Sequence, residues 1–463
     1  MPELKLTRHW AIVKTPCEWL LCDFSHERLL WFSLAPENAL ALASLDGRTS
    51  RQDIAAQLAT TFKLREPLAR VIVDETFSRF RHCLVAAGDG PPEPPRLLDW
   101  PEGLGLGRLG LARGAAPAQI SLILTDQCNR ACRYCYMNAK HVETPADGLD
   151  IARLAALADE AATLAVQSFV LTGGEPMLFP ESVDLVNVLL ERGFDVRVTT
   201  KNRFDLDRLT KVNRHNLHLE FSLDSLDPVQ VSHFTGSDSA FADAMALLEG
   251  LRGSGIPFII KMVVGRPNLS AVRPLIGFAK SCGAAALNII EYEPSFGRKD
   301  DHLLLTDAER AALRAGAIAL AEEVGQKVEP ILRDGIGTDY RWQPAPGRDE
   351  STPGVYCDQG IRTLTVLPNG DVTCCISLPM YRQVRADNVF ERGIYAVWNE
   401  SSAYLGLANP GRDSMAGTSC ETCDDFEYCN WTGRCQMKTL QWYGGMIGPD
   451  RECARYVENR TAR

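Results

Sequence analysis

The chain has 463 residues, which is enough for about three domains of ~150 residues each. Apolar residues make up 45% of it, enough to fill ordinary cores, while no run approaches the ~20 apolar residues of a membrane span. The net charge of −10 argues against bulk binding to nucleic acid. The first ten residues, MPELKLTRHW, contain no apolar stretch of the kind found in secretory signals, so we expect a cytoplasmic protein.

Cysteines are numerous and unevenly spread. In a chain with no export signal, fifteen of them indicate metal-binding or catalytic thiols rather than disulfides. Residues 88–101, GDGPPEPPRLLDWP, hold five prolines and two glycines, which neither a helix nor a central strand accommodates. We therefore predict five parts: a domain at 1–90, a linker at 91–117, a core at 118–325, a bridging region at 326–353 and a cysteine-rich domain at 354–463.

The first domain is predicted to contain three short strands followed by three helices. The strands are expected at 11–14, 18–23 and 28–33, and the helices at 36–45, 50–61 and 67–86, with Thr49 or Ser50 as the cap of the second. A winged-helix DNA-binding domain has a similar order of elements, but its recognition helix is basic. The segment SRQDIAAQLATTF at 50–62 has one Arg and one Asp, which disfavours the DNA-binding alternative.

The core alternates apolar runs with helical segments. The runs are 119–125, 168–172, 195–200, 217–223, 257–264 and 285–291, and helices fit the gaps, for example at 151–165 and 181–192. Six such units predict an α/β fold with a parallel sheet and right-handed crossovers. In closed barrels of this kind, the chemistry lies at the carboxyl ends of the strands.

Three cysteines follow the first apolar run of the core. Cys128, Cys132 and Cys135 have the spacing C-x3-C-x2-C, and three thiolates can hold three irons of a [4Fe–4S] cluster while the fourth iron stays open. A zinc site is the alternative, but zinc prefers four ligands and no fourth ligand lies near in the sequence. The spacing therefore favours the cluster.

This loop, together with LTGGEP at 171–176 and FSLDSLDP at 221–228, resembles the radical S-adenosylmethionine (SAM) superfamily. The resemblance implies an open partial (β/α)6 barrel and a cluster whose open iron binds SAM, from which one electron releases a 5′-deoxyadenosyl radical. It implies that Glu175 accepts from the SAM ammonium, that Asp224 binds the ribose, and that Lys201 either pairs with the SAM carboxylate or faces solvent. The cofactor-binding residues it implies are Tyr134, Gly173, Gly174, Glu175, Pro176, Lys201, Asn202, Ser222 and Asp224.

The C-terminal cysteines resemble the SPASM extension, which binds two auxiliary [4Fe–4S] clusters. The resemblance assigns Cys357, Cys375 and Cys435 to an inner cluster, and Cys420, Cys423, Cys429 and Cys453 to an outer one. The chain departs from the family in having five residues between Cys429 and Cys435, where three are usual. Cys374 is either the fourth ligand of the inner cluster or a free thiol that donates a hydrogen atom. Adjacent residues of a strand point to opposite faces, which favours an open iron or a free Cys374.

The first domain, with LASLDGRTSRQDIAAQL at its centre, resembles the peptide-recognition element (RRE, PqqD-like) of peptide-modifying enzymes. There a leader peptide adds a strand beside the third strand, where main-chain hydrogen bonds provide affinity. The whole chain thus resembles a maturase of ribosomally made peptides, with three [4Fe–4S] clusters and an electron donor such as flavodoxin or ferredoxin. We expect an intramolecular crosslink, either carbon–carbon or thioether. The alternatives are Cα epimerisation and a non-catalytic peptide-binding scaffold, against which the intact GGEP and SLD motifs argue.

Overall fold

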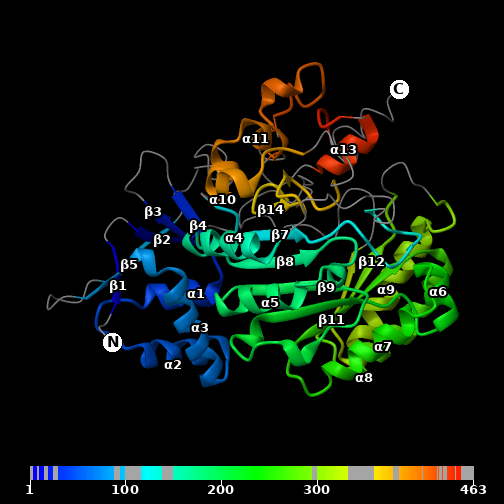
Figure 1. Cartoon of the computed structure of the whole chain (residues 1–463), viewed down its shortest axis with the longest axis horizontal. Coiled ribbons are helices and arrows are strands. Elements are labelled where there is room, and N and C mark those ends of the chain that lie inside the picture. Colours follow the sequence, from blue (N-terminus) through cyan, green and yellow to red (C-terminus); the bar gives the residue numbers. More distant parts are fainter. Residues whose placement is uncertain are drawn as a thin grey trace.

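The computed structural model of the protein describes residues 4–7, 10–14, 19–23, 30–87, 94–99, 116–137, 150–294, 300–331, 359–378, 385–408, 410–424, 426, 430, 435–443 and 445–449. Figure 1 shows a small N-terminal domain at one end of a large twisted sheet, with the C-terminal elements lying over strands β7 and β14. None of the helices among these residues is long and apolar enough to cross a membrane.

The N-terminal domain is built on a four-stranded sheet of order β4-β3-β2-β6. Its strands are β2 (Trp10–Lys14), β3 (Trp19–Asp23), β4 (Leu30–Leu34) and β6 (Arg96–Asp99), and its helices are α1 (Pro36–Ala43), α2 (Arg51–Phe62) and α3 (Glu66–Arg79). A second small sheet pairs β1 (Leu4–Leu6) with β5 (Leu84–Ala86). Ser50 caps α2 as predicted, since its side chain accepts a hydrogen bond from the Asp53 amide over 3.2 Å.

Two boundaries in this domain differ from the sequence-based expectation. The helix expected at 67–86 ends at Arg79, because residues 84–86 pair with β1 instead of continuing the turn. Within the stretch expected to be a linker at 91–117, β6 pairs in parallel with β2. Pro94 and Pro95 precede this strand, and β6 lies at the edge of the sheet, where the missing amide hydrogens of nearby prolines disturb no ladder.

The core forms the predicted parallel sheet. Six strands lie in chain order, and each pairs in parallel with the next: β7 (Gln119–Ile123), β8 (Ser168–Thr172), β9 (Asp195–Thr200), β10 (Leu217–Ser222), β11 (Phe258–Val264) and β12 (Ala286–Glu291). The helices between and after them are α4 (Ile151–Thr163), α5 (Ser182–Glu191), α6 (Pro228–Thr235), α7 (Ala240–Leu251), α8 (Val272–Cys282) and α9 (Asp307–Val324). This is the α/β partial barrel expected.

The sheet extends beyond the expected core at both edges. Strand β13 (Val328–Ile331) adds to β12 in parallel, although residues 326–353 were expected to bridge two domains. At the other edge, β14 (Thr363–Val366) pairs in parallel with β7 and in antiparallel with β15 (Val372–Thr373). The C-terminal part therefore shares one nine-stranded sheet with the core, because its first strand completes the hydrogen bonds of β7.

The C-terminal part continues with helices α10 (Val389–Glu400), α11 (Ser402–Ala408) and α13 (Gln436–Tyr443). Trp398 and Tyr404 are fully buried, with ring centroids 5.8 Å apart, and belong to the same hydrophobic core as the sheet. Helix α10 also contacts α4, where the Tyr395 amide donates to Glu160 Oε1 over 3.2 Å. Packing therefore fixes these helices on the outside of the sheet.

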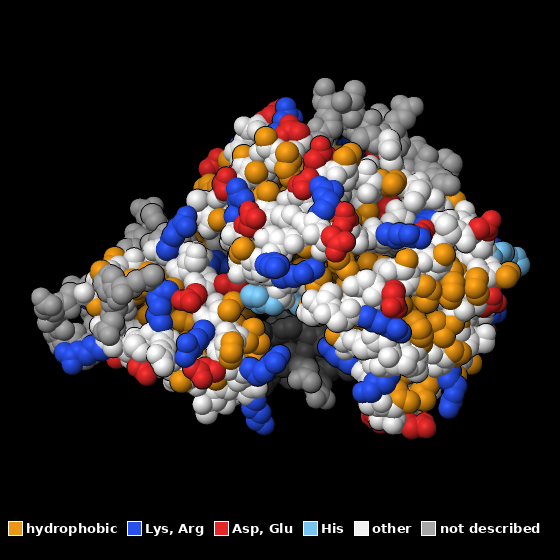
Figure 2. Space-filling view, turned by 60° about the horizontal axis from the view of Figure 1, so that its bottom comes forward, with side chains coloured by type: hydrophobic (Ala, Val, Ile, Leu, Met, Phe, Trp, Pro, Cys, Tyr) orange, Lys and Arg blue, Asp and Glu red, His pale blue; other side chains and the backbone are white. Residues whose placement is uncertain are grey.

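The N-terminal domain docks at the amino ends of the barrel strands. Arg79 Nη2 donates to the carbonyl of Gly193 over 2.8 Å, just before β9, and Asn216 Nδ2, just before β10, donates to Glu75 Oε1 over 3.1 Å. Ala165, before β8, packs into the core of the N-terminal domain. On the face shown in Figure 2, the domain and the barrel form two lobes separated by a hollow, with acidic and basic side chains interspersed over both.

Candidate active site

The three-cysteine loop begins directly after β7, at the carboxyl end of the sheet. Cys132 is buried, and Cys128 and Cys135 are half-buried. The Cys135 amide donates to the Cys132 carbonyl over 3.1 Å, which forms a tight turn, and the Arg130 amide donates to Cys128 Sγ over 3.4 Å. The three predicted thiols therefore lie on one short loop.

Main-chain bonds fasten this loop to the end of helix α6. The Ala131 amide donates to the Thr235 carbonyl over 2.8 Å, and the Arg133 amide donates to the Phe234 carbonyl over 2.9 Å. The next residue, Gly236, has φ +61°, and a Cβ there would lie 2.9 Å from that of Ala131. The glycine therefore permits the close approach of the two segments.

Arg130 is a positioning residue that the sequence reasoning missed. Its side chain is 2% exposed, and its guanidinium pairs with Asp243 over 2.6 Å and donates to Asn202 Oδ1 over 2.9 Å. It also bonds the hydroxyls of Ser237 and Ser239. One side chain thus links the cysteine loop to α7 and to the end of β9. The only signal in the sequence was an arginine between two ligand cysteines.

The GGEP turn lies beside this loop. The Gly174 amide donates to the Thr125 carbonyl over 2.8 Å, and the Glu175 amide donates to the Gln127 carbonyl over 2.9 Å. Gly173 has φ +141°, and a Cβ on it would lie 2.4 Å from the Thr125 carbonyl oxygen. No side chain fits there, so the glycine is required for the ends of β7 and β8 to come together.

Glu175 joins strand ends to one another. Its carboxylate accepts from Thr200 Oγ1 over 2.6 Å, from the Lys201 amide over 2.9 Å and from the Met177 amide over 3.1 Å. Burial raises the pKa of Glu175, although these hydrogen bonds lower it. The resemblance implied that this carboxylate accepts from the SAM ammonium. In the structure these three hydrogen bonds position Lys201 and the turn.

Lys201 and Asp224 form the polar floor of the site. Lys201 Nζ lies 3.6 Å from Asp224 Oδ2 and 5.4 Å from the ring centroid of Tyr134, and its side chain is 17% exposed. Asp224 also accepts from the Tyr134 hydroxyl and, over 2.9 Å, from the Val263 amide. Of the two alternatives for Lys201, the structure favours the pocket.

The Lys201 ammonium tests whether SAM fits here. Nζ is buried and has no hydrogen-bond partner among the described residues, so it offers three donors to a ligand. A SAM carboxylate is a suitable acceptor. Burial raises the pKa of Cys132 to about 12 and also raises that of Cys128, so binding of iron to these thiols would require that they exchange protons for metal. The donors are of the chemical kind that both groups need, although no three His, Cys, Asp or Glu side chains of the described residues form a group that could hold a metal ion.

Three further predicted residues lie around these strand ends. Asn202 exchanges hydrogen bonds with Asn129, with Nδ2 to Asn129 Oδ1 at 3.3 Å, so it holds the cysteine loop. Ser222 is half-buried at the last position of β10, and Asp224 follows it by two residues. Pro176 begins a short 3-10 turn and is buried. The structure thus brings together the ends of β7, β8, β9 and β10.

The C-terminal cysteines are described in part. Cys375, Cys420, Cys423 and Cys435 are half-buried, and the Cys423 amide donates to the Cys420 carbonyl over 3.4 Å. Cys357, Cys429 and Cys453 lie outside the described residues. Cys374 is fully buried in the core, and its thiol donates to Gln436 Oε1 over 2.9 Å. Its burial does not favour the alternative in which Cys374 donates a hydrogen atom, and the alternative in which it is the fourth ligand of the inner cluster stays a prediction.

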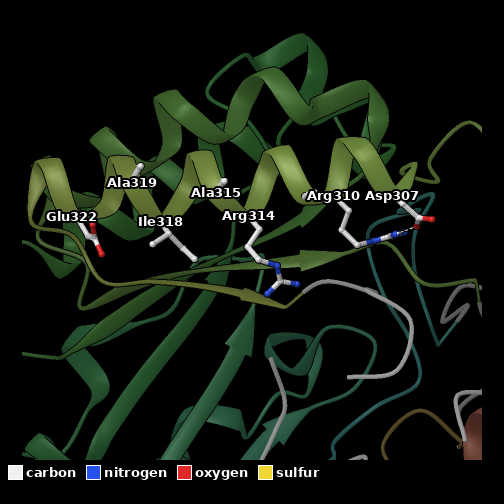
Figure 3. A pocket seen from close by; sticks show the side chains of 8 residues that line it. Asp307, Arg310, Arg314, Ala315, Ile318, Ala319 and Glu322 are labelled. Carbon is white, nitrogen blue, oxygen red and sulfur yellow. Dashed lines mark hydrogen bonds and ion pairs between the residues drawn. The ribbon is translucent and has the colours of Figure 1, made fainter. Parts of the chain in front are cut away.

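A separate hollow of about 530 Å³ runs along α9 (Figure 3). Its lining residues are Asp307, Arg310, Ala311, Arg314, Ala315, Ile318, Ala319 and Glu322. Arg310 forms a bidentate pair with Glu291 at the end of β12, with both bonds 2.8 Å long. None of the lining residues belongs to the cysteine loop or the GGEP turn, so this hollow is not the site described above.

Comparisons with known proteins agree with the site. Residues 122–279 match the family described as the Radical SAM superfamily, and residues 357–424 match SPASM, described as an iron–sulfur cluster-binding domain. A PqqA peptide cyclase of Gluconobacter oxydans is 26% identical over 350 residues, which cover 73% of this chain and 90% of the relative. One of Ruegeria pomeroyi is 27% identical over 359 residues, which cover 73% and 88%.

Solved structures share the fold. Streptococcus suis SuiB bound to S-adenosylmethionine superposes with a TM-score of 0.60 at 14% identity, covering 97% of this chain and 100% of its own. The structure of anSMEcpe with bound AdoMet has a TM-score of 0.53 at 17% identity, covering 73% of this chain and 95% of its own. The cysteine loop and the GGEP turn lie within the matched residues, so the chain contains a radical SAM domain at 122–279 and a SPASM domain at 357–424 and is an enzyme of the radical SAM type.

Proposed function

We propose that this enzyme installs an intramolecular crosslink, carbon–carbon or thioether, in a ribosomally made precursor peptide. The buried Lys201 ammonium, which acts electrostatically on Cys128 and Cys132, carries the SAM part of the proposal. Apart from its 3.6 Å ion pair with Asp224, it makes no hydrogen bond among the described residues. The peptide part is supported by the relatives, which are PqqA peptide cyclases, and by SuiB, which was also solved bound to the precursor peptide SuiA.

Each residue of the site has a separate task. The three thiols hold the cluster, Lys201 binds the SAM carboxylate, and Asp224 faces the ribose while Tyr134 and Val263 hold it in place. When bound, the cluster and SAM supply a 5′-deoxyadenosyl radical that removes one hydrogen atom from the peptide. The chain orients the peptide, and the ion pair of Arg130 with Asp243 holds the cysteine loop in place.

The C-terminal cysteines bear on where the electron released by crosslinking goes. Crosslinking forms one bond and removes two hydrogens from the peptide: one leaves as an atom, and the other as a proton and an electron. Cys357, Cys375 and Cys435 would hold one auxiliary [4Fe–4S] cluster, and Cys420, Cys423, Cys429 and Cys453 would hold another; such a cluster would supply an acceptor for this electron. Flavodoxin or ferredoxin of the cytoplasm serves as the external electron donor in this proposal.

The N-terminal domain is proposed to bind the leader segment of the precursor. Strand β4 lies at the edge of its sheet, where one row of main-chain groups has no partner strand among the described residues. A peptide can add there by main-chain hydrogen bonds. Hydrogen exchange on the full chain tests this: a leader peptide should slow exchange in Leu30–Leu34, whereas protection at β6 alone would contradict it.

Mass spectrometry of a candidate precursor peptide tests the function. The peptide is taken from a gene adjacent to that of the enzyme and incubated anaerobically with SAM and a reductant. A loss of two hydrogens per event supports crosslinking. An unchanged mass in water, with a gain of about one unit in deuterium oxide, identifies epimerisation instead. Release of 5′-deoxyadenosine with no change to any peptide in either solvent would refute both.

A further inference from the structure

On strand β11 of the barrel sheet, the described residues cover one face more fully than the other. Along Phe258–Val264, residues alternate strictly between buried and half-buried. The buried set, including Ile260 and Met262, packs into the core formed with the helices. The half-buried set, including Lys261, must therefore point to the opposite, inner face. A parallel sheet covered on both faces would bury both sets.

Strand register places three polar residues side by side on this face. Lys261 of β11 lies beside Ser222 of β10 and beside Asn288 of β12. Neighbouring strands are about 4.8 Å apart, so the three side chains form one row across the sheet. Ser222 precedes Asp224 by two residues, a rise of roughly 7 Å along an extended chain. The row therefore lies one layer below the SAM site.

Most of the polar groups near this row already have partners. Lys261 Nζ pairs with the carboxylate of Glu220, which also accepts from Thr199 Oγ1 over 3.0 Å and pairs with Arg197 over 3.2 Å. Glu220 is 4% exposed. Lys261, Glu220 and Arg197 thus form a polar wall. Because their charges are already paired, they do not need a charged ligand.

Asn288 is the exception. The residue is 9% exposed, and its Oδ1 is buried with no hydrogen-bond partner in the described part of the chain. A buried polar atom without a partner is unfavourable, and such atoms are usually satisfied by a ligand or by water. A side-chain amide carries an acceptor and donors next to each other. That pattern is complementary to a peptide unit, which offers an N–H and a C=O.

We propose that Asn288 binds a main-chain peptide group of the substrate and thereby holds the reacting segment in an extended form below the SAM site. This inference rests on the proposed function, because it takes the ligand to be a peptide. Because it contacts the main chain, Asn288 is a positioning residue whose binding does not depend on the neighbouring side chains of the peptide. Lys261 and Glu220 form the wall against which that segment lies.

The test compares Asn288→Leu with the wild-type enzyme on the precursor peptide. Loss of one or two hydrogen bonds should raise the KM for peptide about tenfold, with a smaller change in kcat. Asn288→Asp retains the acceptor and should restore part of the loss. Asn399→Leu is the matched control, because Asn399 lies on α10 and bonds the Tyr395 carbonyl at the surface.

A KM within twofold of wild type for both Asn288 variants would overturn the inference and indicate that the amide binds only water. If Asn288→Leu loses cluster iron, the KM of Asn288→Asp alone decides the inference, since this substitution preserves the volume of the side chain. If the wild-type enzyme leaves the peptide unmodified, the proposed function fails. The inference is then decided by the affinity of the SAM-loaded protein for the same peptide, which should fall in Asn288→Leu; equal affinity would overturn it.

Discussion

Arg130 Nη2 lies 2.6 Å from Asp243 Oδ2, and this ion pair connects the loop of three cysteines to helix α7. The arginine is almost fully buried, and hydrogen bonds from Arg130, Ser239 and Arg203 lower the pKa of Asp243 although burial opposes this. The loop therefore depends on a contact between residues more than a hundred positions apart in the chain.

Arg130→Met should destabilise the protein and release the cluster of the cysteine loop. It removes the buried partner of Asp243, which keeps Ser239 and the exposed Arg203, and the lost charge-assisted hydrogen bond costs about 2 kcal/mol. The unfolding midpoint and the iron content measure the two effects. Arg252→Met is the control, because Arg252 pairs with Glu249 at the surface with both side chains more than 60% exposed, and it should change neither. A variant of Arg130 with full iron content would show that the thiols alone hold the loop.

Gly173→Ala should abolish SAM binding. The added methyl group would overlap the Thr125 carbonyl oxygen, so the ends of β7 and β8 must separate. The change is measured by equilibrium dialysis of SAM and by the yield of 5′-deoxyadenosine. Gly277→Ala is the matched control: its Cβ meets no atom within 4 Å, and alanine in a helix stabilises by up to ~1 kcal/mol. Normal SAM binding by Gly173→Ala would place the ligand elsewhere.

Lys201→Met should weaken SAM binding by about thirtyfold, equivalent to about 2 kcal/mol for a charge-assisted hydrogen bond. The reason is that its buried ammonium has no other hydrogen-bond partner in the described residues. Titration of the reconstituted enzyme with SAM measures the dissociation constant. Lys211→Met, at an exposed position, is the control. An unchanged dissociation constant for SAM would mean that Lys201 has only a structural role, as the ion-pair partner of Asp224.

Glu75→Gln should flatten the pH dependence of stability at the junction of the N-terminal domain and the barrel. Burial raises the pKa of Glu75, although the Asn216 amide and His215 lower it. Because the folded pKa lies above the unfolded value of about 4.3, the stability from burying the neutral acid is present below that value and is lost as pH rises through the folded pKa. Glutamine stays neutral and can still accept from Asn216.

The unfolding midpoints of wild type and Glu75→Gln, measured from about pH 4 to about pH 8, compare the pH dependence of their stability. The wild-type midpoint should fall relative to that of the variant as pH rises. Parallel curves would mean that Glu75 has the same pKa in the folded and unfolded chains.

Cys374→Ala should retain the full iron content of the wild type, about twelve irons if three four-iron clusters are present. It should also lose about 1–2 kcal/mol of stability, since Gln436 Oε1 loses its buried donor. Iron analysis and thermal unfolding measure both. Cys282→Ala, at the half-buried end of α8, is the comparison. A loss of about four irons would make Cys374 a cluster ligand.

The sequence alone determined the elements whose signals are local. Alternation of apolar runs placed β8 and β9 at their observed bounds, because a strand of a parallel sheet is a short continuous apolar run. The cysteine spacing and the GGEP letters identified the site, because thiols on one short loop and a turn without side chains need no distant partner to be recognised.

Only the tertiary structure decided which residues hold these motifs together. Arg130 is fixed by Asp243, and Asn288 is singled out by a buried oxygen that has no hydrogen-bond partner within the described part of the chain. Neither relationship leaves a periodic trace in the sequence. The strand β6 and the addition of β14 to β7 were equally hidden. The physical reason is that pairing at a sheet edge and burial of a polar group depend on which distant segments arrive there, whereas local patterns record only which face of an element is apolar.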